Sequence, residues 1–486
     1  MKAAFPLQRV EAALSSVTNK HTTPACLAYI VQDGGRRGRA SIHTSQVKKQ
    51  PATLAESIPA SSSAHTSNAS QGDSTMPALS VLPLSSVLRT YFITTISSSP
   101  TLLGASTSLL QRMLNSRNPL FRLDSNPVMR ALLWETFYKQ FCAGETEAQV
   151  DKRCAELRKE GYAGVILEYA PEVLADAEGN EPEDVAFWRQ GMLDSVKMAS
   201  PGDFIGLKWS GMGPDAMRLM KANKEPTERM SEAMHALCKA AAAKNLALLP
   251  AAEETWSLTG FHDWCLRMQR VYNIDGKAVV YSTHQAYLKQ TPQRIAEQLA
   301  IAKEEGFTYG LKLVRGAYLG TEKRELIHPT IEATHACYDN LASALIHRAY
   351  NDTLQPIKGD STASFPDLNV VLATHNAVSV ENAQRLRQEQ ADRGEALTPL
   401  NFAQLQGMAD EVSCRLIADA KANLSNDKAV KERVFKCSTW GPIYDCLNYL
   451  LRRAAENKDA AGRTNDTRRA MQAEIWRRFK GVFGMA

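Results

Sequence analysis

Residues 292–316 read PQRIAEQLAIAKEEGFTYGLKLVRG and join the two patterns that decide the fold. The first part, Pro292–Glu305, has apolar residues at helical spacing and is closed by a glycine. The second part, Gly310–Gly316, is a short apolar run of the length expected for a strand buried on both faces. A helix followed closely by such a strand is the repeating unit of a parallel α/β sheet.

The same alternation continues from about residue 160 to the C-terminal part of the chain. We predict further helices at Glu322–Tyr350, Val380–Arg393 and Glu411–Ala422. The predicted strands are Gly164–Tyr169, Phe204–Ser210, Leu246–Ala252, Ala278–Gln285, Gly310–Gly316, Leu368–Thr374, Asn401–Leu405 and Arg433–Cys437. Eight strands that each precede a helix predict a closed (β/α)8 barrel, with an open doubly wound sheet as the alternative. Two longer connections, 175–182 and 351–366, are predicted surface insertions.

Charge separates the start of the chain from the rest. Residues 1–50 hold eight Lys or Arg and two acids, which is typical of a mitochondrial transit peptide, with a generic disordered N-terminus as the alternative. We predict that the Ser/Thr-rich residues 51–80 are a disordered linker. We then predict an N-terminal helical arm (81–159), a barrel with a lid helix (160–458) and a basic C-terminal helix (459–486).

Composition excludes several classes of protein. The 436 residues after the leader carry 49 bases and 50 acids, so they offer no electrostatic basis for binding nucleic acid. The apolar stretch 81–110 is interrupted by prolines, an arginine and serines, and therefore predicts no spanning helix. The nine cysteines are scattered without a Cys-x-x-Cys pair, which favours reduced thiols over a zinc or redox site.

The tail Asp466–Phe483 is a basic amphipathic helix. We expect it to pack under the barrel. Contact with an anionic membrane surface is the alternative.

Polar residues collect where the predicted strands end, which is where parallel barrels bind their ligands. Lys208 and Lys312 each interrupt a buried apolar run, and a lysine in such a place requires a partner or a ligand. Snorkelling to solvent or pairing with a nearby carboxylate is the alternative for each. The other strand-end candidates are Gln285, Val314, Gly316, Ala317, Tyr318, Thr374, His375, Asn376 and Gln404.

One face of a predicted helix near the C-terminus carries Tyr449, Arg452, Arg453 and Glu456, while leucines and alanines occupy the other face. Paired guanidiniums can hold a small carboxylate bidentately, and the tyrosine can cover its apolar part. A solvated charged face with an internal Arg–Glu pair is the alternative.

The stretch 211–216 imitates a dinucleotide fingerprint, because it follows a strand, opens a helix and has the form G-x-G-x-x-A. The acidic residue expected about 20 positions later is missing, so we do not favour a Rossmann site. Pro214 is better explained as a first-turn helix residue. No metal site is visible in the sequence.

Five motifs in the same order resemble the proline dehydrogenase family, and its mitochondrial eukaryotic branch in particular. They are 312–318 (KLVRGAY), 373–376 (ATHN), 404–408 (QLQGM), 440–442 (WGP) and 449–457 (YLLRRAAEN), within a resemblance that covers about 136–479. The resemblance implies a distorted (β/α)8 barrel whose last helix lies over the C-terminal ends of the strands.

The resemblance also implies the site. FAD would contact Gln285, Lys312, Val314, Gly316, Ala317, Thr374, His375, Asn376, Gln404 and Leu405, with Glu456 near its ribityl chain. The substrate carboxylate would be held by Arg452, Arg453 and Lys208, and the ring would be walled by Tyr318, Leu405 and Tyr449. Lys312 would stabilise the negative charge that develops as the flavin is reduced.

The activity implied is oxidation of L-proline to 1-pyrroline-5-carboxylate, with electrons passed to a quinone at the matrix side of the inner mitochondrial membrane. Two positions depart from the family pattern, because Ala251 and Cys437 stand where an aspartate and a tyrosine are usual. A hydroxyproline dehydrogenase and a flavin-binding barrel without catalysis therefore remain as alternatives.

Overall fold

The computed structural model describes residues 77–116, 118, 126–171, 179–357, 364–456 and 461–484, without the side chains of 453–456 and 461–463. All of these residues belong to the compact unit Asp73–Ala486. The predicted transit peptide (1–50) and nearly all of the predicted linker (51–80) lie outside the described residues.

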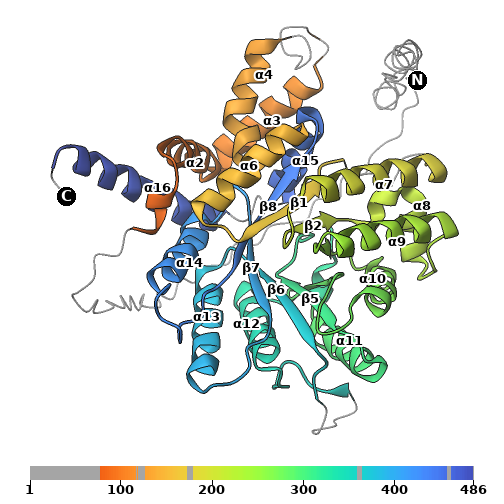
Figure 1. The fold of residues 1–486 in the computed structure, drawn as a ribbon. Coiled ribbons are helices and arrows are strands. Elements are labelled where there is room, and N and C mark those ends of the chain that lie inside the picture. The colour runs from red at the N-terminus through yellow and green to blue at the C-terminus, as the bar shows by residue number, and fades with distance from the viewer. Residues whose placement is uncertain are drawn as a thin grey trace, which may run out of the picture. The chain divides into compact units, whose positions relative to one another are not determined.

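Eight parallel strands form the centre of the molecule (Figure 1). Their order is β3-β2-β1-β8-β7-β6-β5-β4, and a parallel bridge links Leu248 of β3 to Val280, just before β4, across the two ends of that order. The sheet therefore closes, as the predicted barrel requires. The strands are β1 (Gly164–Tyr169), β2 (Phe204–Leu207), β3 (Ala247–Pro250), β4 (Ser282–Gln285), β5 (Tyr309–Val314), β6 (Leu368–Ala373), β7 (Leu400–Leu405) and β8 (Val434–Trp440).

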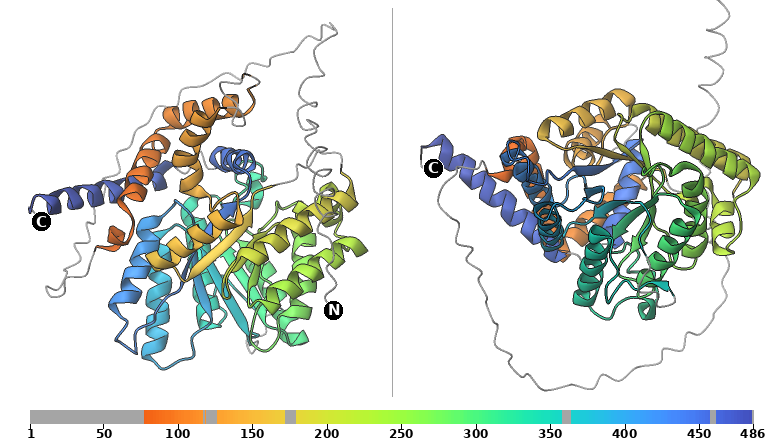
Figure 2. Two further views of the ribbon diagram at one scale, coloured as in Figure 1. Left: turned by 45° about the horizontal axis from the view of Figure 1, so that its top comes forward. Right: turned by 60° about the horizontal axis from the view of Figure 1, so that its bottom comes forward.

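Helices form a ring around the strands, which is clearest on the right of Figure 2. The ring and its neighbours comprise α6 (Glu147–Glu160), α7 (Glu181–Met198), α8 (Pro214–Lys221), α9 (Glu228–Ala243), α10 (Leu258–Tyr272), α11 (Thr291–Glu305), α12 (Ile331–His347), α13 (Ala377–Asp392) and α14 (Asp410–Ala422). Short helices occur at η5 (Trp209–Met212) and η6 (Arg324–Leu326). The predicted α/β barrel is confirmed.

An arm of helices and the lid helix lie at one end of this barrel, at the top of Figure 1. The arm consists of η3 (Ala78–Val81), α2 (Leu84–Ser97), α3 (Pro100–Leu114), α4 (Pro127–Leu133), η4 (Trp134–Tyr138) and α5 (Lys139–Phe141). The lid is α15 (Ile443–Glu456), whose buried Ile443, Cys446 and Leu447 pack with Leu110 and Leu133 of the arm. The last helix, α16 (Ala461–Val482), follows the lid.

Side chains alternate between the two faces of each strand, and those on the inward face fill the barrel interior. Inward-facing Ile166, Phe204, Tyr281, Val371 and Phe435 pack together, and Phe204 meets the rings of Tyr281 and Phe435 edge-on. Residues two positions further along each strand share this inward face. The interior core thus defines which side chains reach the C-terminal end of the barrel.

Several predicted boundaries were wrong. β2 ends at Leu207, so Lys208 follows the strand instead of interrupting it, and β4 begins only at Ser282. The predicted helix 322–350 begins at Ile331, where Thr330 caps it by accepting a hydrogen bond from the Ala333 amide. The hydroxyl cap and the preceding Pro329 explain this late start. Of the two predicted insertions, residues 175–178 and 358–363 lie outside the described residues.

The predicted position of the C-terminal helix was also wrong. α16 packs along α2 and against α14 on the flank of the barrel, rather than under the strands. Its buried Met471 joins Leu79, Leu82, Val87 and Cys414 in a separate small core. An apolar partner surface that the arm supplies therefore determines where this helix lies.

Candidate functional site

The C-terminal ends of the strands bring most of the predicted residues together. Lys312 shares a face with Thr283 and Val371, because these residues are partners across β4, β5 and β6. Val314 is paired in the same way with Gln285. Inward-facing Val371 places this face inside the barrel, so Lys312 lies in the upper interior.

The β4–β5 wall is fixed through Gln285, whose side chain is buried. Its Nε2 donates to the Glu253 carbonyl at 3.1 Å, and its Oε1 accepts from the Ala317 amide at 3.3 Å. Gly316 and Ala317 are exposed just beyond β5. A Cβ on Gly316 would lie 2.4 Å from the ring of Tyr287, so only glycine lets this backbone lie flat on that ring.

The ends of β6 and β7 hold one another. Gln404 is buried, and its Nε2 donates to the Thr374 carbonyl at 3.2 Å while its Oε1 accepts from the Ser413 hydroxyl at 3.0 Å. His375 accepts from the Leu405 amide at 3.1 Å through Nε2. The Leu405 side chain nevertheless remains 38% exposed, although it ends a buried strand.

Asn376 serves the backbone, since its side chain accepts from the Ser379 amide at 3.0 Å and caps α13. The Thr374 hydroxyl accepts from the Asn376 amide at 3.1 Å. These contacts fix the turn after β6, so Thr374 and Asn376 both have a structural role.

The lid helix reaches across the strand ends. Tyr449 of α15 is nearly buried and donates from its hydroxyl to Glu168 Oε2 on β1 at 3.2 Å. Arg452 lies one turn further along the same helix and is half-buried. The side chains of Arg453 and Glu456 lie outside the described residues.

Lys208 and Tyr318 stand on either side of β3. Lys208 directly follows β2 and is half-buried, and its carbonyl accepts from the Trp188 indole at 3.0 Å. The Tyr318 hydroxyl donates to the Ala252 carbonyl at 2.8 Å, beyond the end of β3. Both residues therefore belong to the same end of the barrel as the lid.

Cys437 faces into the barrel beside Glu168, with 3.8 Å between its Sγ and Glu168 Oε2. Burial, and then the Glu168 carboxylate, raise the pKa of this thiol well above its usual value. Lys312 acts in the opposite direction on the same group, which places its ammonium near Cys437. The thiol stays protonated at neutral pH and is unsuited to act as a nucleophile.

Sequence reasoning missed three residues. Glu168 is a charged break in the apolar run 164–169, a signal of the same kind as Lys208 and Lys312. Arg315 donates to His335 Nδ1 at 3.0 Å, Thr374 Oγ1 at 2.5 Å and Ser379 Oγ at 2.7 Å, and lies 4.3 Å over the ring centroid of Tyr338. Tyr287, the support of Gly316, gave no signal in the sequence.

The glycines of the dinucleotide-like stretch serve packing. A Cβ on Gly211 would lie 2.7 Å from Trp188, and Gly213 has a φ of 106° with Asp184 alongside. Both glycines therefore permit α7 to approach η5 and α8 closely. Pro214 is the first residue of α8, as predicted.

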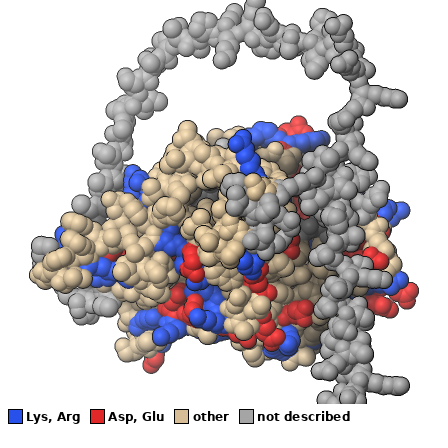
Figure 3. All heavy atoms as spheres, turned by 90° about the horizontal axis from the view of Figure 1, so that it is seen from above, with Lys and Arg blue, Asp and Glu red and all other residues tan. Residues whose placement is uncertain are grey.

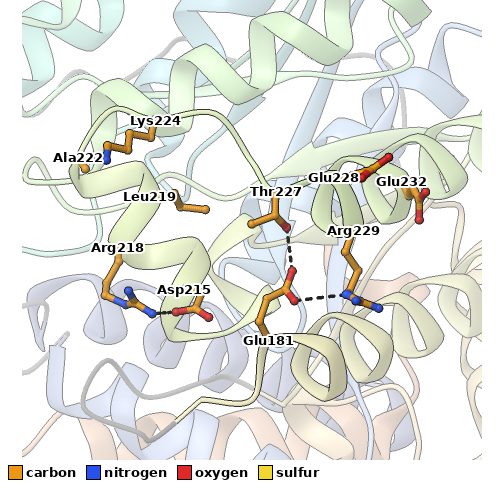
Figure 4. A pocket seen from close by; sticks show the side chains of 10 residues that line it. All are labelled: Glu181, Asp215, Arg218, Leu219, Ala222, Lys224, Thr227, Glu228, Arg229 and Glu232. Atoms are coloured by element: carbon orange, nitrogen blue, oxygen red, sulfur yellow. Dashed lines mark hydrogen bonds and ion pairs between the residues drawn. The ribbon is translucent and has the colours of Figure 1, made fainter.

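A large open hollow lies on the flank of the barrel between α7, α8 and α9, with a volume of about 890 Å³ (Figure 4). Several of its polar residues bond to one another, since Glu181 accepts from Thr227 at 2.8 Å and from Arg229 at 3.3 Å. Asp215 and Arg218 form a further ion pair. The hollow is separate from the strand ends, so we do not assign the site to it.

Within the described part of the chain, no group of His, Cys, Asp and Glu side chains is arranged to hold a metal ion. The eight cysteines in that part are all free thiols.

Known proteins resemble this chain in sequence. The human protein "Proline dehydrogenase 1, mitochondrial" is 32% identical over 260 residues, which are 52% of this chain and 39% of the human protein. The Arabidopsis thaliana protein of the same name is 27% identical over 404 residues, covering 71% of this chain and 75% of that protein. "Probable proline dehydrogenase, mitochondrial" of Schizosaccharomyces pombe is 28% identical over 403 residues, with coverages of 71% and 79%.

Solved structures share the fold. Proline utilization A from Bdellovibrio bacteriovorus superimposes with a TM-score of 0.53 at 14% identity, over 69% of this chain and 34% of that one. A Bradyrhizobium japonicum proline utilization A variant gives 0.51 at 18% identity, over 71% and 33%. The family model described as Proline dehydrogenase matches residues 150–466, which contain the whole barrel and the lid. The chain belongs to the proline dehydrogenase family.

Proposed function

We propose that this chain oxidises L-proline to 1-pyrroline-5-carboxylate with FAD bound at the C-terminal end of the barrel. The contact that carries the proposal is the hydrogen bond between Tyr449 of the lid and Glu168 of β1. It holds α15 over the strand ends at which Lys208, Lys312 and Tyr318 lie. Family membership supports the same assignment.

The strand ends have the character that a flat, partly apolar cofactor requires. Gly316 and Ala317 present exposed backbone without bulky side chains, and Leu405 presents exposed apolar surface. A bound flavin supplies hydride acceptance, which no side chain of the site provides. The residues proposed to hold FAD are Gln285, Lys312, Val314, Gly316, Ala317, Thr374, His375, Asn376, Gln404, Leu405 and Glu456.

The substrate is proposed to lie between this wall and the lid. Arg452, Arg453 and Lys208 would hold its carboxylate, with a guanidinium fork fixing the orientation. Tyr318, Leu405 and Tyr449 would enclose the ring and exclude water. The nearby cations Lys208 and Lys312 favour the neutral form of the proline amine, from which hydride can leave the adjacent ring carbon.

Proline-dependent bleaching of a flavin spectrum tests this proposal. The purified protein should be yellow, and excess proline without oxygen should reduce it. Arg453→Lys keeps the charge but loses the planar fork, so KM for proline should rise about tenfold or more while flavin content stays normal. An unchanged KM would remove Arg453 from the carboxylate site.

Hydroxyproline is a second candidate substrate, favoured by one observation. Cys437 is smaller than the tyrosine usual at this position, and Glu168 lies beside it as a hydrogen-bond acceptor for an added hydroxyl. Comparison of kcat/KM for proline and 4-hydroxyproline decides between them, since a site that bonds a substrate hydroxyl strongly rejects the analogue without it.

We further propose that the electrons pass to a membrane quinone in the mitochondrion, at the matrix side of the inner membrane. The relatives are named as mitochondrial, and the first 50 residues have the composition of a transit peptide. None of the described helices is both long and apolar enough to span a bilayer. We propose that contact with the membrane is peripheral.

The pair α2 and α16 is the surface proposed for that contact. Trp476, Phe479 and Phe483 form a row of neighbouring aromatic rings, stacked in the first pair and tilted in the second, and they are 57%, 47% and 60% exposed. Helix α16 contains six basic and two acidic residues, a charge that suits anionic lipid. On α2, Leu84, Leu88 and Phe92 are exposed at helical spacing. Figure 3 shows this end of the molecule from above, where the left margin has lysine and arginine but little acid.

Sedimentation with vesicles tests the surface. Wild type should bind vesicles that contain anionic lipid, and the triple change Trp476→Ala, Phe479→Ala, Phe483→Ala should abolish binding while dye-linked proline oxidation persists. Phe187→Ala on α7 is the matched control, because Phe187 is also an exposed aromatic. Undiminished binding by the triple variant would contradict the assignment.

A further inference from the structure

The segment Tyr138–Glu145 lies before residue 150, where the match to the family model begins. It comprises the end of the arm and the link to α6, and it runs beside the C-terminal ends of β7 and β8. Its side chains and backbone bond to two separate turns of the barrel. We call this segment the brace.

The first turn that the brace contacts is Gln406–Ala409, between β7 and α14. Gln140 is buried, and its Nε2 donates to the Gly407 carbonyl at 3.0 Å. In return, Gln406 Nε2 donates to the Cys142 carbonyl at 2.9 Å. Gly407 has a φ of 74°, and a Cβ there would lie 2.4 Å from the Gln140 carbonyl oxygen, so turn and brace are in direct backbone contact.

Gln140 itself is held from behind by α2. Its Nε2 also donates to Thr90 Oγ1 at 2.9 Å, and its Oε1 accepts from Arg89 Nε at 3.1 Å. The nitrogen and the oxygen of this buried amide therefore both have partners, and loss of a partner is costly in a buried position. The β7–α14 turn is thus connected to the arm through one fixed side chain.

The second turn is 441–443, between β8 and the lid. The Ala143 amide donates to the Thr439 carbonyl at 2.7 Å, and the Gly441 amide donates to the Gly144 carbonyl at 3.0 Å. Glu145 Oε1 accepts from the Ile443 amide at 2.7 Å, at the first residue of α15. The Tyr138 hydroxyl donates to the Gly441 carbonyl at 2.8 Å.

Each turn directly adjoins one half of the proposed site, the first the flavin-binding wall and the second the lid. Gln404 and Leu405 precede the first turn, and the second begins the helix that carries Tyr449 and Arg452. Small displacements of groups that orient a cofactor or substrate cause large losses of binding or rate. We propose that the brace positions both halves, with Gln140 acting on the flavin side and Glu145 acting on the lid.

This inference rests on the proposed function, and it predicts a split between two variants. Gln140→Leu keeps the volume but loses three hydrogen bonds, so the flavin Kd should rise about tenfold while KM for proline at saturating flavin changes less than twofold. Glu145→Ala should raise KM for proline about tenfold with normal flavin content. Glu145→Gln retains an acceptor for the Ile443 amide and should restore KM. Glu135→Gln, at an exposed ion pair with Lys139 on the same arm, is the matched control and should behave as wild type.

Hydrogen exchange gives a readout that requires no flavin. Gln140→Leu should speed exchange at 406–409 only, and Glu145→Ala should speed exchange at 443–452 only. Equal changes in both regions, equal effects on flavin Kd and proline KM, or no change in either would overturn the brace as a positioning device. A wild-type protein without flavin would contradict the proposed function. The exchange pattern would still show whether the brace positions the two turns.

Discussion

The two sides of the barrel mouth are held in place by different parts of the chain. On the β4–β6 side, the strand ends are tied to neighbouring segments by two residues of the barrel itself, Gln285 and Arg315. On the β7–β8 side, the turns are held from outside by the arm, through contacts such as Gln140 to Gly407, which are 267 residues apart in sequence. The geometry of the β4–β6 side is therefore set by the barrel itself, whereas the geometry of the β7–β8 side depends on a segment outside the family match.

A buried lysine on the β7–β8 side gives the largest expected effect. Lys436 is 1% exposed, lies 2.8 Å from Asp410 Oδ1 and donates to the Met408 carbonyl at 2.8 Å. Lys436→Met leaves Asp410 without its cation and should lower the free energy of unfolding by about 3–5 kcal/mol. Urea denaturation measures this loss.

Lys197→Met is its matched control, because Lys197 forms an exposed pair with Glu147. It should leave the free energy of unfolding nearly unchanged, because exposed ion pairs are screened by solvent and contribute little. Equal effects of the two substitutions would show that the buried ion pair does not hold the β7–α14 turn.

Arg315→Lys tests the opposite side. Lysine keeps the charge but cannot reach His335, Thr374 and Ser379 together, so stability should fall by about 2–3 kcal/mol and flavin content should drop. Thermal unfolding and the flavin-to-protein ratio measure the two effects. Arg324→Lys is the control, since Arg324 makes an exposed bond to the Pro329 carbonyl and should be tolerated. Full flavin content in Arg315→Lys would show that the contacts of Arg315 do not hold the β4–β6 side in place.

Gly316→Ala tests the β4–β6 side of the barrel mouth with a single added methyl group. The added methyl would meet the Tyr287 ring at 2.4 Å, so the backbone proposed to lie against the flavin must shift, at a cost of about 1–3 kcal/mol. Flavin Kd, read by fluorescence titration, should rise. Gly320→Ala is the control, with nothing within 4 Å of its Cβ, and should leave the flavin Kd unchanged.

The β4–β5 side also gives the stability a pH dependence. His284 stacks on His262, and burial lowers the pKa of both, that of His284 from 6.5 to about 3. The unfolded chain therefore takes up protons that the folded chain cannot, so stability falls as pH drops from about 6.5 towards 3. The expected slope is about 1.4 kcal/mol per pH unit for each histidine. Unfolding of wild type and His284→Gln at several pH values should give a shallower slope for the variant.

The sequence predicted the β4–β6 side of the site much better than the β7–β8 side. Lys312 interrupts an apolar run and Gln285 ends one, and a parallel barrel gathers such residues at one end whatever the loops do. Contacts of the brace left no such pattern, because Gln140 and Glu145 are ordinary polar residues whose partners are distant in sequence. The place of α16 was predicted wrongly for the same reason, since its partner α2 cannot be identified from amphipathicity alone.

The anaerobic visible spectrum of the purified protein before and after addition of L-proline tests the central claim most directly. The account predicts a flavin spectrum that proline bleaches and that a dye acceptor restores. A protein without flavin absorbance, or one whose flavin no imino acid reduces, would contradict it.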